Sequence, residues 1–296
     1  NTGNPPPFGV EAPDEVIRDV AMNLRQAQGY TNSKGVFSAR KAVMQYYQLK
    51  GIRDIDIEDI YIGNGVSELI LLSLQALLDN GDEVLVPIPD YPLWTGAVTL
   101  AGGKPIHYLC DEQSNWYPDI ADIKKKITPK TKGIVVINPN NPTGSYIRPA
   151  EYEQLITLCK TNGMSIIADE VFFYHFLEDE ASFCSFIHCE EVPTFTLNGL
   201  SKLLCLPQVK LGWIHVSGSK DTDLFHALDM IADTFLSPNV FSMTALPGLL
   251  HYIPSWNKTV RHRIKTNYEY AHHICHTDTP FRVRSTQGGW SAMIEV

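Results

Sequence analysis

Apolar residues follow two alternating patterns along the chain. In one they recur every three or four residues, as on the buried face of a helix, and in the other they form short continuous runs, as in strands buried on both faces. This alternation predicts an α/β fold, with a three-layer, mainly parallel sheet and helices on both faces. The predicted helices span residues 36–51, 67–81, 91–103, 120–127, 149–163, 221–236 and 255–274, and the predicted strands span 83–87, 105–109, 133–138, 165–169, 194–198, 211–216, 281–284 and 290–296.

The patterns also divide the chain into three regions. We expect residues 1–27 to form an N-terminal arm, 28–253 a large domain with the sheet, and 254–296 part of a smaller α+β domain. The last apolar stretch, 290–296, is a predicted strand that ends the chain with no helix after it. We therefore expect the sequence to be a truncated or partial form of a longer chain.

Composition narrows the class of protein. The chain has 296 residues and a formal net charge of −9, which argues against nucleic-acid binding because phosphate neutralisation needs a basic surface. No apolar run reaches the ~18 residues that a membrane helix needs. The first residues, "NTGNPPPFGV", have neither the charged start nor the apolar stretch of a secretory signal, which favours a cytoplasmic location.

The cysteines and histidines indicate neither a disulfide framework nor a metal site. The six cysteines are scattered, without a CxxC pair, which favours buried reduced thiols over a disulfide framework. A histidine cluster, "HHICH" at 272–276, could indicate a metal. No second group of ligands with a matching spacing accompanies it, so we predict no metal site.

Four junctions between predicted elements carry polar residues, and in open α/β sheets ligands bind where strands end. The first is "IGNGVSEL", residues 62–69. Its backbone N–H groups and the Ser67 hydroxyl could bind a phosphate at a helix start, or the stretch could be a plain helix cap. The spacing matches neither the Rossmann nor the Walker motif.

The other three junctions each follow an apolar strand. "NPNNPTG", residues 138–144, is a rigid turn that can project an asparagine amide over the sheet edge. In "SIIADEVF", Asp169 could cap a helix or hold a cationic ring nitrogen. In "LNGLSKLLCLPQVKLGW", Lys202 lies among apolar residues. Its amine either reaches solvent or is kept partly desolvated because the function requires it.

Taken together, these junctions and the aromatic residue of "PDYP" resemble the class I and II aminotransferases, fold-type-I enzymes that use pyridoxal 5′-phosphate (PLP). The resemblance runs along the whole chain. Its first half, with "GNPPPFGVEAPDEVI", "AQGYTNSKGVFSARKAV", "GNGVSELI" and "NPNNPTG", is most similar to bacterial glutamate–pyruvate (alanine) aminotransferases.

The resemblance implies a role for each matching residue. Lys202 would be the Schiff-base lysine, Asp169 the partner of the pyridine nitrogen, and Asn141 the donor to the ring 3-oxygen, next to the substrate. The remaining roles would be phosphate binding by Val66, Ser67 and Lys210, ring stacking by Tyr91, contact with the other subunit's phosphate in a homodimer by Tyr30, and a backbone surface for the substrate carboxylate at Gly3.

These roles make physical sense. PLP stabilises a carbanion at the amino-acid Cα, and a protonated ring nitrogen strengthens that effect. A buried aspartate keeps the proton on the nitrogen because opposite charges favour each other. The lysine must be neutral to attack the aldehyde, and desolvation lowers the pKa of an amine toward that state.

The sequence departs from the family pattern at four points. Phe172 stands where a tyrosine usually donates to the 3-oxygen, Lys210 replaces a phosphate-clamping arginine, and Gly199 replaces a phosphate-binding serine, with Ser201 out of register. The arginine that pairs with the substrate carboxylate lies beyond the last residue of this chain. We do not assign its role to either of two upstream arginines, Arg282 and Arg284.

Three functions are compatible with this sequence. The first is an aminotransferase that exchanges an amino group between an L-amino acid, alanine or glutamate by resemblance, and a 2-oxo acid. The second is a PLP-dependent lyase, such as a carbon–sulfur lyase, which shares Lys202, Asp169 and Asn141. The third is a catalytically weak binding protein of the same fold, which Phe172 and the missing arginine favour and the three shared residues oppose.

Overall fold

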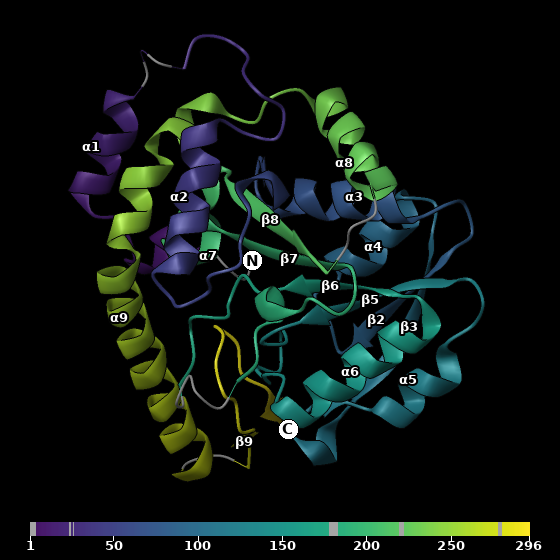
Figure 1. The fold of residues 1–296 in the computed structure, drawn as a ribbon. Coiled ribbons are helices and arrows are strands. Elements are labelled where there is room, and N and C mark those ends of the chain that lie inside the picture. Colours follow the sequence, from purple (N-terminus) through teal and green to yellow (C-terminus); the bar gives the residue numbers. More distant parts are fainter. Residues whose placement is uncertain (1–3, 24, 26, 178–182, 219–221, 278–279) are drawn as a thin grey trace.

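A twisted sheet of eight strands lies between two layers of helices (Figure 1). The computed structural model describes residues 4–23, 25, 27–177, 183–218, 222–277 and 280–296. The strands of the large sheet are β1 (Ile60–Gly63), β2 (Glu83–Ile88), β3 (Lys104–Asp111), β4 (Tyr117–Pro118), β5 (Thr131–Ile137), β6 (Ser165–Asp169), β7 (Thr194–Gly199) and β8 (Gly212–Ser217). The helices are α1 (Asp14–Met22), α2 (Phe37–Gln48), α3 (Val66–Leu77), α4 (Leu93–Leu100), α5 (Ile120–Lys126), α6 (Pro149–Asn162), α7 (Leu200–Leu203), α8 (Thr222–Phe235) and α9 (Val240–Thr277).

The sheet is mainly parallel, as predicted. The strand order is β1-β8-β7-β6-β5-β2-β3-β4, and the pairs formed by β3, β2, β5, β6 and β7 are parallel. β8 runs antiparallel to both β7 and β1, and β4 runs antiparallel to β3. Two short strands, β9 (Arg282–Val283) and β10 (Ile294–Glu295), pair separately, within the two terminal stretches that we predicted to be strands.

Alternation along the central strands sorts their side chains into two cores. Val135 and Ile137 of β5 pack with residues of α3, α4 and α8, whereas Ile134 and Val136 pack with residues of α5 and α6. Because successive strand residues point to opposite faces, a strand covered by helices on both sides must be apolar throughout. A third core lies between α2, α9 and the β1–β8 edge, and Figure 1 shows α2 beside the upper part of α9.

Helix α9 differs most from its prediction. It begins at Val240, well before the predicted start at residue 255, and it contains Pro247 and Pro254. Proline usually ends or kinks a helix because it lacks an N–H donor. Here Leu246 and Leu249 are fully buried against the third core, and this packing offsets the two missing donors. The helix also runs through residue 253, where we place a domain boundary.

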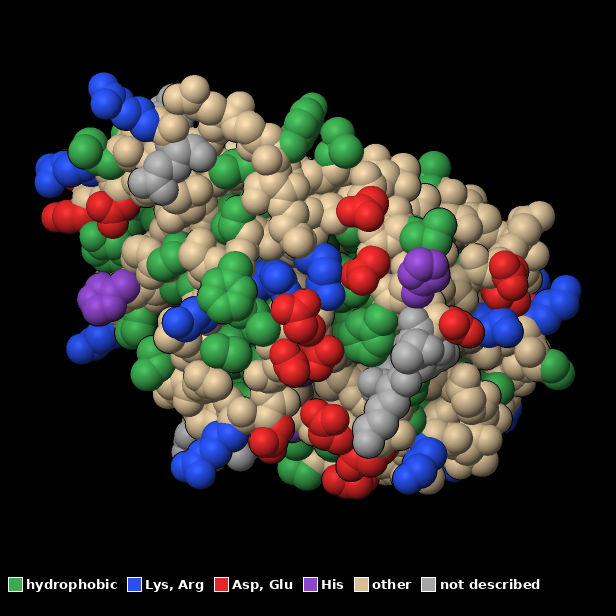
Figure 2. Space-filling model, turned by 45° about the horizontal axis from the view of Figure 1, so that its top comes forward, with side chains coloured by type: hydrophobic (Ala, Val, Ile, Leu, Met, Phe, Trp, Pro, Cys, Tyr) green, Lys and Arg blue, Asp and Glu red, His purple; other side chains and the backbone are tan. Residues whose placement is uncertain are grey.

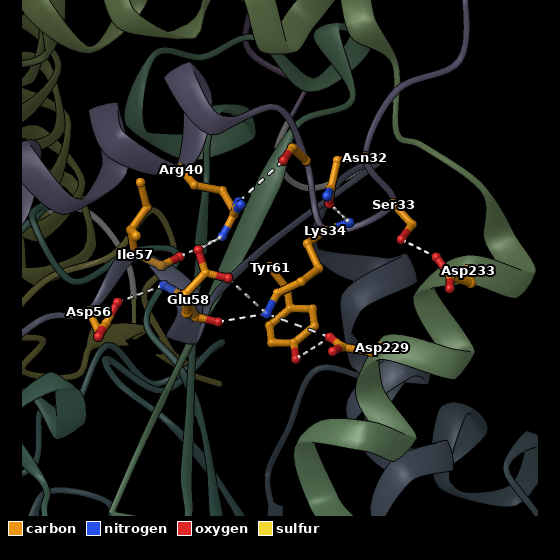
Figure 3. A network of polar contacts seen from close by, with 11 residues as sticks. Asn32, Ser33, Lys34, Arg40, Asp56, Ile57, Glu58, Tyr61, Asp229 and Asp233 are labelled. Atoms are coloured by element: carbon orange, nitrogen blue, oxygen red, sulfur yellow. Dashed lines mark hydrogen bonds and ion pairs between the residues drawn. The ribbon is translucent and has the colours of Figure 1, made fainter. Parts of the chain in front are cut away.

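A polar network joins the segment before α2 to β1 and α8 (Figure 3). Lys34 Nζ lies 2.8 Å from the carbonyl oxygen of Glu58, 3.5 Å from Asp229 Oδ1 and 4.5 Å from the centroid of the Tyr61 ring. Tyr61 donates to Asp229 Oδ1 over 2.7 Å, and Arg40 NH1 lies 3.2 Å from Glu58 Oε1. These contacts therefore anchor the segment that precedes α2 against β1 and α8.

Surface charge, helix hydropathy, cysteine pairing and the grouping of metal-ligating residues were each considered in the sequence, and the structure shows each of them. On the face drawn in Figure 2, Lys and Arg side chains lie beside Asp and Glu side chains and form no continuous basic patch. Of the helices in the described ranges, none is both long and apolar enough to cross a membrane. Within the same ranges no disulfide joins the cysteines, and no group of three or more histidine, cysteine or acidic residues could hold a metal.

The turn at 138–144 is packed against the C-terminal segment through a glycine. Gly144 has a φ of +73°, and its carbonyl oxygen accepts from the N–H groups of Gln287 (3.2 Å) and Gly288 (3.1 Å). A Cβ at this position would lie 1.8 Å from Thr286 Oγ1 and 2.4 Å from the Gly288 oxygen. The glycine therefore permits both the turn and the close approach of residues 286–288.

We predict that Gly144→Ala lowers the free energy of unfolding by about 3 kcal/mol, because left-handed strain adds to overpacking. The matched control is Gly163→Ala, where φ is +63° and nothing lies within 4 Å of the added Cβ. That variant should lose only about 1 kcal/mol. Urea unfolding of both variants measures the difference, and equal losses would refute the packing argument.

Candidate active site

A cavity of about 750 Å³ lies at the carboxyl ends of the parallel strands. Its walls come from the start of α3, the 138–144 turn, the end of β6, α7, one side of α9 and the C-terminal segment. The structure brings seven of the predicted site residues to these walls: Val66, Ser67, Tyr91, Asn141, Asp169, Lys202 and Lys210. This is the position that an open parallel sheet offers to a ligand.

Asp169 is the last residue of β6 and is almost fully buried. Its Oδ2 accepts from Trp94 Nε1 and its Oδ1 from the backbone N–H of Val171, each over 3.3 Å. Burial raises the pKa of the Asp169 carboxyl to about 6, although both hydrogen bonds and the positive charge of Lys202 lower it. A buried acid of this kind favours a cationic partner.

Lys202 lies on the short helix α7, which directly follows β7. Its Nζ is 5.5 Å from the centroid of the Phe172 ring and 5.4 Å from that of the Trp290 ring. Burial lowers the pKa of this amine, and the Asp169 charge partly restores it. The amine lies in the cavity wall beside aromatic rings. Of the two interpretations of its apolar sequence neighbours, the structure therefore favours a partly desolvated amine.

The start of α3 provides donors for an anion. Its N-cap is Gly65, which offers no capping side chain, so the first N–H groups are left for a ligand. Val66 and Ser67 line the cavity at this point. The Lys210 amine lies close by, because a Cβ built on Gly65 would come within 3.7 Å of Lys210 Nζ.

The asparagines of the 138–144 turn have two different roles. Asn138 and Asn140 hold the turn, since Asn138 Nδ2 donates to the Cys184 oxygen (2.8 Å) and Asn140 Nδ2 to the Pro89 oxygen (3.1 Å). Pro89 belongs to the loop that carries Tyr91, so Asn140 joins two walls of the cavity. Asn141 lines the cavity, and its amide has no hydrogen-bond partner among the described residues.

The structure does not place the other two predicted site residues in the cavity lining. Tyr30 is 83% exposed and absent from the described lining, and its implied role in another subunit stays a prediction. Gly3 lies outside the described residues.

Comparison with known proteins identifies the family. The sequence profile described as "Aminotransferase class I and II" matches residues 1–294. The chain belongs to this aminotransferase family. A glutamate-pyruvate aminotransferase, AlaA, of Haemophilus influenzae is 48% identical over 268 residues, which are 88% of this chain and 65% of that protein. AlaA of Escherichia coli K12 is 49% identical over 253 residues, 84% of this chain and 62% of that protein.

The chain therefore spans a little under two thirds of the length of these curated relatives. Solved structures agree with the assignment. An aminotransferase from Escherichia coli superposes with a TM-score of 0.87 at 43% identity, covering 97% of this chain and 72% of that one. An alanine aminotransferase from Pyrococcus furiosus superposes with a TM-score of 0.91 at 31% identity, covering 97% and 73%.

The cavity fits pyridoxal phosphate, the cofactor of this aminotransferase family. Its lining contains the start of α3 with no capping side chain, the buried carboxylate of Asp169, the Lys202 amine of lowered pKa and the Asn141 amide. A cofactor with a phosphate, a ring nitrogen, an aldehyde and a ring oxygen matches each of these groups. The volume also lies within the usual range for cofactor sites.

The structure explains two of the departures from the aminotransferase pattern. Phe172 lines the cavity where a tyrosine is usual, and Tyr174 does not replace it because its ring packs beside Tyr46 and under Lys50 Nζ (3.4 Å), away from the lining. Gly199 has no room for a serine, since a Cβ there would lie 2.9 Å from the Leu211 oxygen. Ser201 does line the cavity and supplies a hydroxyl.

The arginines of the C-terminal part have separate partners. Arg284 NH2 lies 2.6 Å from Glu112 Oε1, and neither Arg282 nor Arg284 is among the described lining residues. The one arginine in that lining is Arg263 of α9. Its NH2 donates to the carbonyl oxygen of Phe8 over 2.6 Å, so it holds the N-terminal segment, which also lines the cavity.

Sequence reasoning missed two tryptophans of this site. Trp94 donates to Asp169 from the second residue of α4, and Trp290 flanks Lys202 from the C-terminal segment. Trp290 lies far from the strand-end motifs along the sequence. Trp94 sits inside the quoted stretch "YPLWTGAVTLAGG", but nothing in its spacing indicates a polar role.

We predict that Asp169→Asn stabilises the cofactor-free protein at neutral pH. The folded state holds the Asp169 proton more tightly than the unfolded chain, whose value is 3.8, so stability is lost as pH rises from about 4 to about 6. The asparagine removes this loss, a gain of up to about 3 kcal/mol above pH 6. Urea unfolding between pH 4 and pH 8 measures it.

The control for that experiment is Asp54→Asn, because Asp54 is exposed. Its stability relative to wild type should stay constant across the same pH range. If the Asp169 variant shows no gain above pH 6, the carboxyl is not destabilised by burial.

Proposed function

We propose that this protein is a PLP-dependent aminotransferase that moves an amino group between an L-amino acid and a 2-oxo acid. The single observation that supports this most is the joint presence of Lys202 and Asp169 in one cavity beside the start of α3. Its relatives are named as glutamate–pyruvate and alanine aminotransferases. Their names favour alanine and glutamate as amino donors and the corresponding 2-oxo acids as acceptors.

Each residue would act through the property that its surroundings give it. Val66, Ser67 and Lys210 would hold the phosphate, Asp169 the ring nitrogen and Asn141 the ring oxygen, and Tyr91 would pack against the ring, since all of them line the cavity. When bound, PLP supplies an electron sink for negative charge at the amino-acid Cα. Lys202 Nζ, whose pKa is lowered by burial, would accept the proton from that carbon and later release it.

The walls of the cavity assist this proton transfer. Phe172 and Trp290 flank the half-buried Lys202 amine and reduce its contact with water, which slows proton exchange with solvent at this atom. Arg263 binds the N-terminal segment, whose residues Asn4 and Phe8 also line the cavity. We expect both features to favour return of the proton to substrate.

The alternatives are less well supported. A carbon–sulfur lyase would use the same three residues, but the named relatives are aminotransferases. A binding protein without activity is disfavoured because Lys202, Asp169 and Asn141 all line the cavity, together with the anion site.

We also propose that the enzyme is a cytoplasmic homodimer. Tyr30 is held outside the cavity by the segment that follows it, where the Thr31 N–H donates to Ser237 Oγ over 3.2 Å and Ser33 bonds to Asp233 (Figure 3). An exposed tyrosine on an anchored segment is suited to reach the phosphate site of a second subunit. Buried thiols, such as those of Cys159 and Cys189, fit a reducing compartment.

The first test of this function is covalent attachment of the cofactor to Lys202. After incubation with PLP and reduction by borohydride, peptide mapping of the wild type should find the added mass on the peptide with residue 202. Lys202→Ala should show none at that peptide, while Lys160→Ala, which changes an exposed lysine on α6, should be labelled normally. Label retained elsewhere in the cavity of the Lys202 variant would contradict the assignment.

Products separate the reaction types. With L-alanine and 2-oxoglutarate, we expect pyruvate and glutamate in equal amounts and no ammonia. Ammonia with pyruvate from L-cysteine would indicate a lyase, and cofactor attachment without either product would indicate a binding protein.

Lys210→Ala should weaken PLP binding by about tenfold, because one charge-assisted contact to phosphate is lost while the helix start remains. Lys210→Arg should restore it. Fluorescence titration with PLP measures both variants, and unchanged affinity in Lys210→Ala would remove this residue from the phosphate site.

A further inference from the structure

The histidine cluster near the end of α9 has a geometry that the proposed reaction does not use. His272 and His276 are four residues apart on one helix, and their rings stack with centroids 4.1 Å apart and planes at 28°. Both side chains are exposed. Residues four apart lie on the same face of a helix, one turn above the other, so both imidazoles extend from the same face of α9.

Two imidazoles at this spacing form a bidentate ligand. A metal–nitrogen bond of 2.0–2.1 Å requires the two donor atoms to lie about 3 Å apart. The rings, whose centroids are 4.1 Å apart, can reach that arrangement without moving the helix if their side chains rotate out of the stacked geometry until one in-plane nitrogen of each faces the ion. Imidazole suits copper, zinc and nickel, and affinity for divalent ions is highest for Cu²⁺.

We propose that His272 and His276 bind a divalent transition-metal ion, Cu²⁺ or Zn²⁺, with water completing the coordination. The described residues contain no third histidine, cysteine or acidic ligand in reach of one site, so the protein supplies two ligands. The site borders the proposed active site. Ala271 and Tyr268 line the cavity, and the Tyr268 ring centroid is 6.2 Å from that of His272.

The control for this site lies on the same helix. His273 is also exposed but is adjacent to His272 in sequence, and adjacent helix residues point about 100° apart. Removing His273 should therefore leave the pair intact. The neighbouring thiol of Cys275 is a second control, because the proposed site needs no sulfur ligand.

Electron paramagnetic resonance of Cu²⁺ added to the PLP-loaded protein tests the proposal. The wild type, His273→Ala and Cys275→Ser should bind one ion whose spectrum shows coupling to two nitrogens. His272→Ala and His276→Ala should bind at least about tenfold more weakly and lose the two-nitrogen signal. Thermal unfolding should show a Cu²⁺-dependent rise in Tm in the first set and none in the second.

Two results would overturn the site. One is unchanged two-nitrogen binding in His272→Ala, and the other is loss of binding in Cys275→Ser with His276→Ala unaffected. Unfolding without metal checks that each variant folds, and His272→Asn and His276→Asn serve if an alanine variant does not. Lys202→Ala should retain the copper signal, so the metal site stands or falls separately from the proposed aminotransferase activity.

Discussion

Withdrawal of two opposite charges from water is the constraint around which this structure is built. Burial raises the pKa of the Asp169 carboxyl and lowers that of the Lys202 amine, so each group alone would tend toward its neutral form. Their mutual attraction opposes both shifts. Burial and mutual attraction therefore act in opposite directions on the protonation of this pair, and perturbed groups of this kind are typical of sites of acid–base chemistry.

The sheet is what holds that pair in place. β5, β6 and β7 are parallel neighbours, and the residues that follow their carboxyl ends include Asn141, Asp169 and Lys202. Their register places Ile137 of β5 beside Asp169 of β6 and Asp169 beside Leu197 of β7, so the segments that carry the three side chains meet at one edge. Trp94 adds a donor from α4, and its indole is fully buried, which leaves it little freedom to move.

Much of this arrangement could be predicted from the sequence because it is local. Each site motif directly follows an apolar strand, and parallel strands end at the same edge, so Asn141, Asp169 and Lys202 could be expected to meet. Long-range packing could not be predicted in the same way. The course of α9 through Pro247 depends on a core built by α2 and the β1–β8 edge, and the position of Trp290 beside Lys202 depends on how the C-terminal segment folds back.

The departures from the family pattern differ in whether backbone groups or side chains supply the contact in question. At the start of α3 the anion donors are backbone N–H groups, which persist whatever side chains surround them. The site can therefore lose a serine at position 199, where Leu211 and Gly212 leave no space for a Cβ, and can accept Lys210 as a single positive charge. Position 172 has no such support from the backbone. Phe172 offers no hydroxyl, and Tyr174 packs away from the described lining, so under the proposed function Asn141 would be the donor to the ring oxygen, and this is where we expect the chemistry to differ most from that of its relatives.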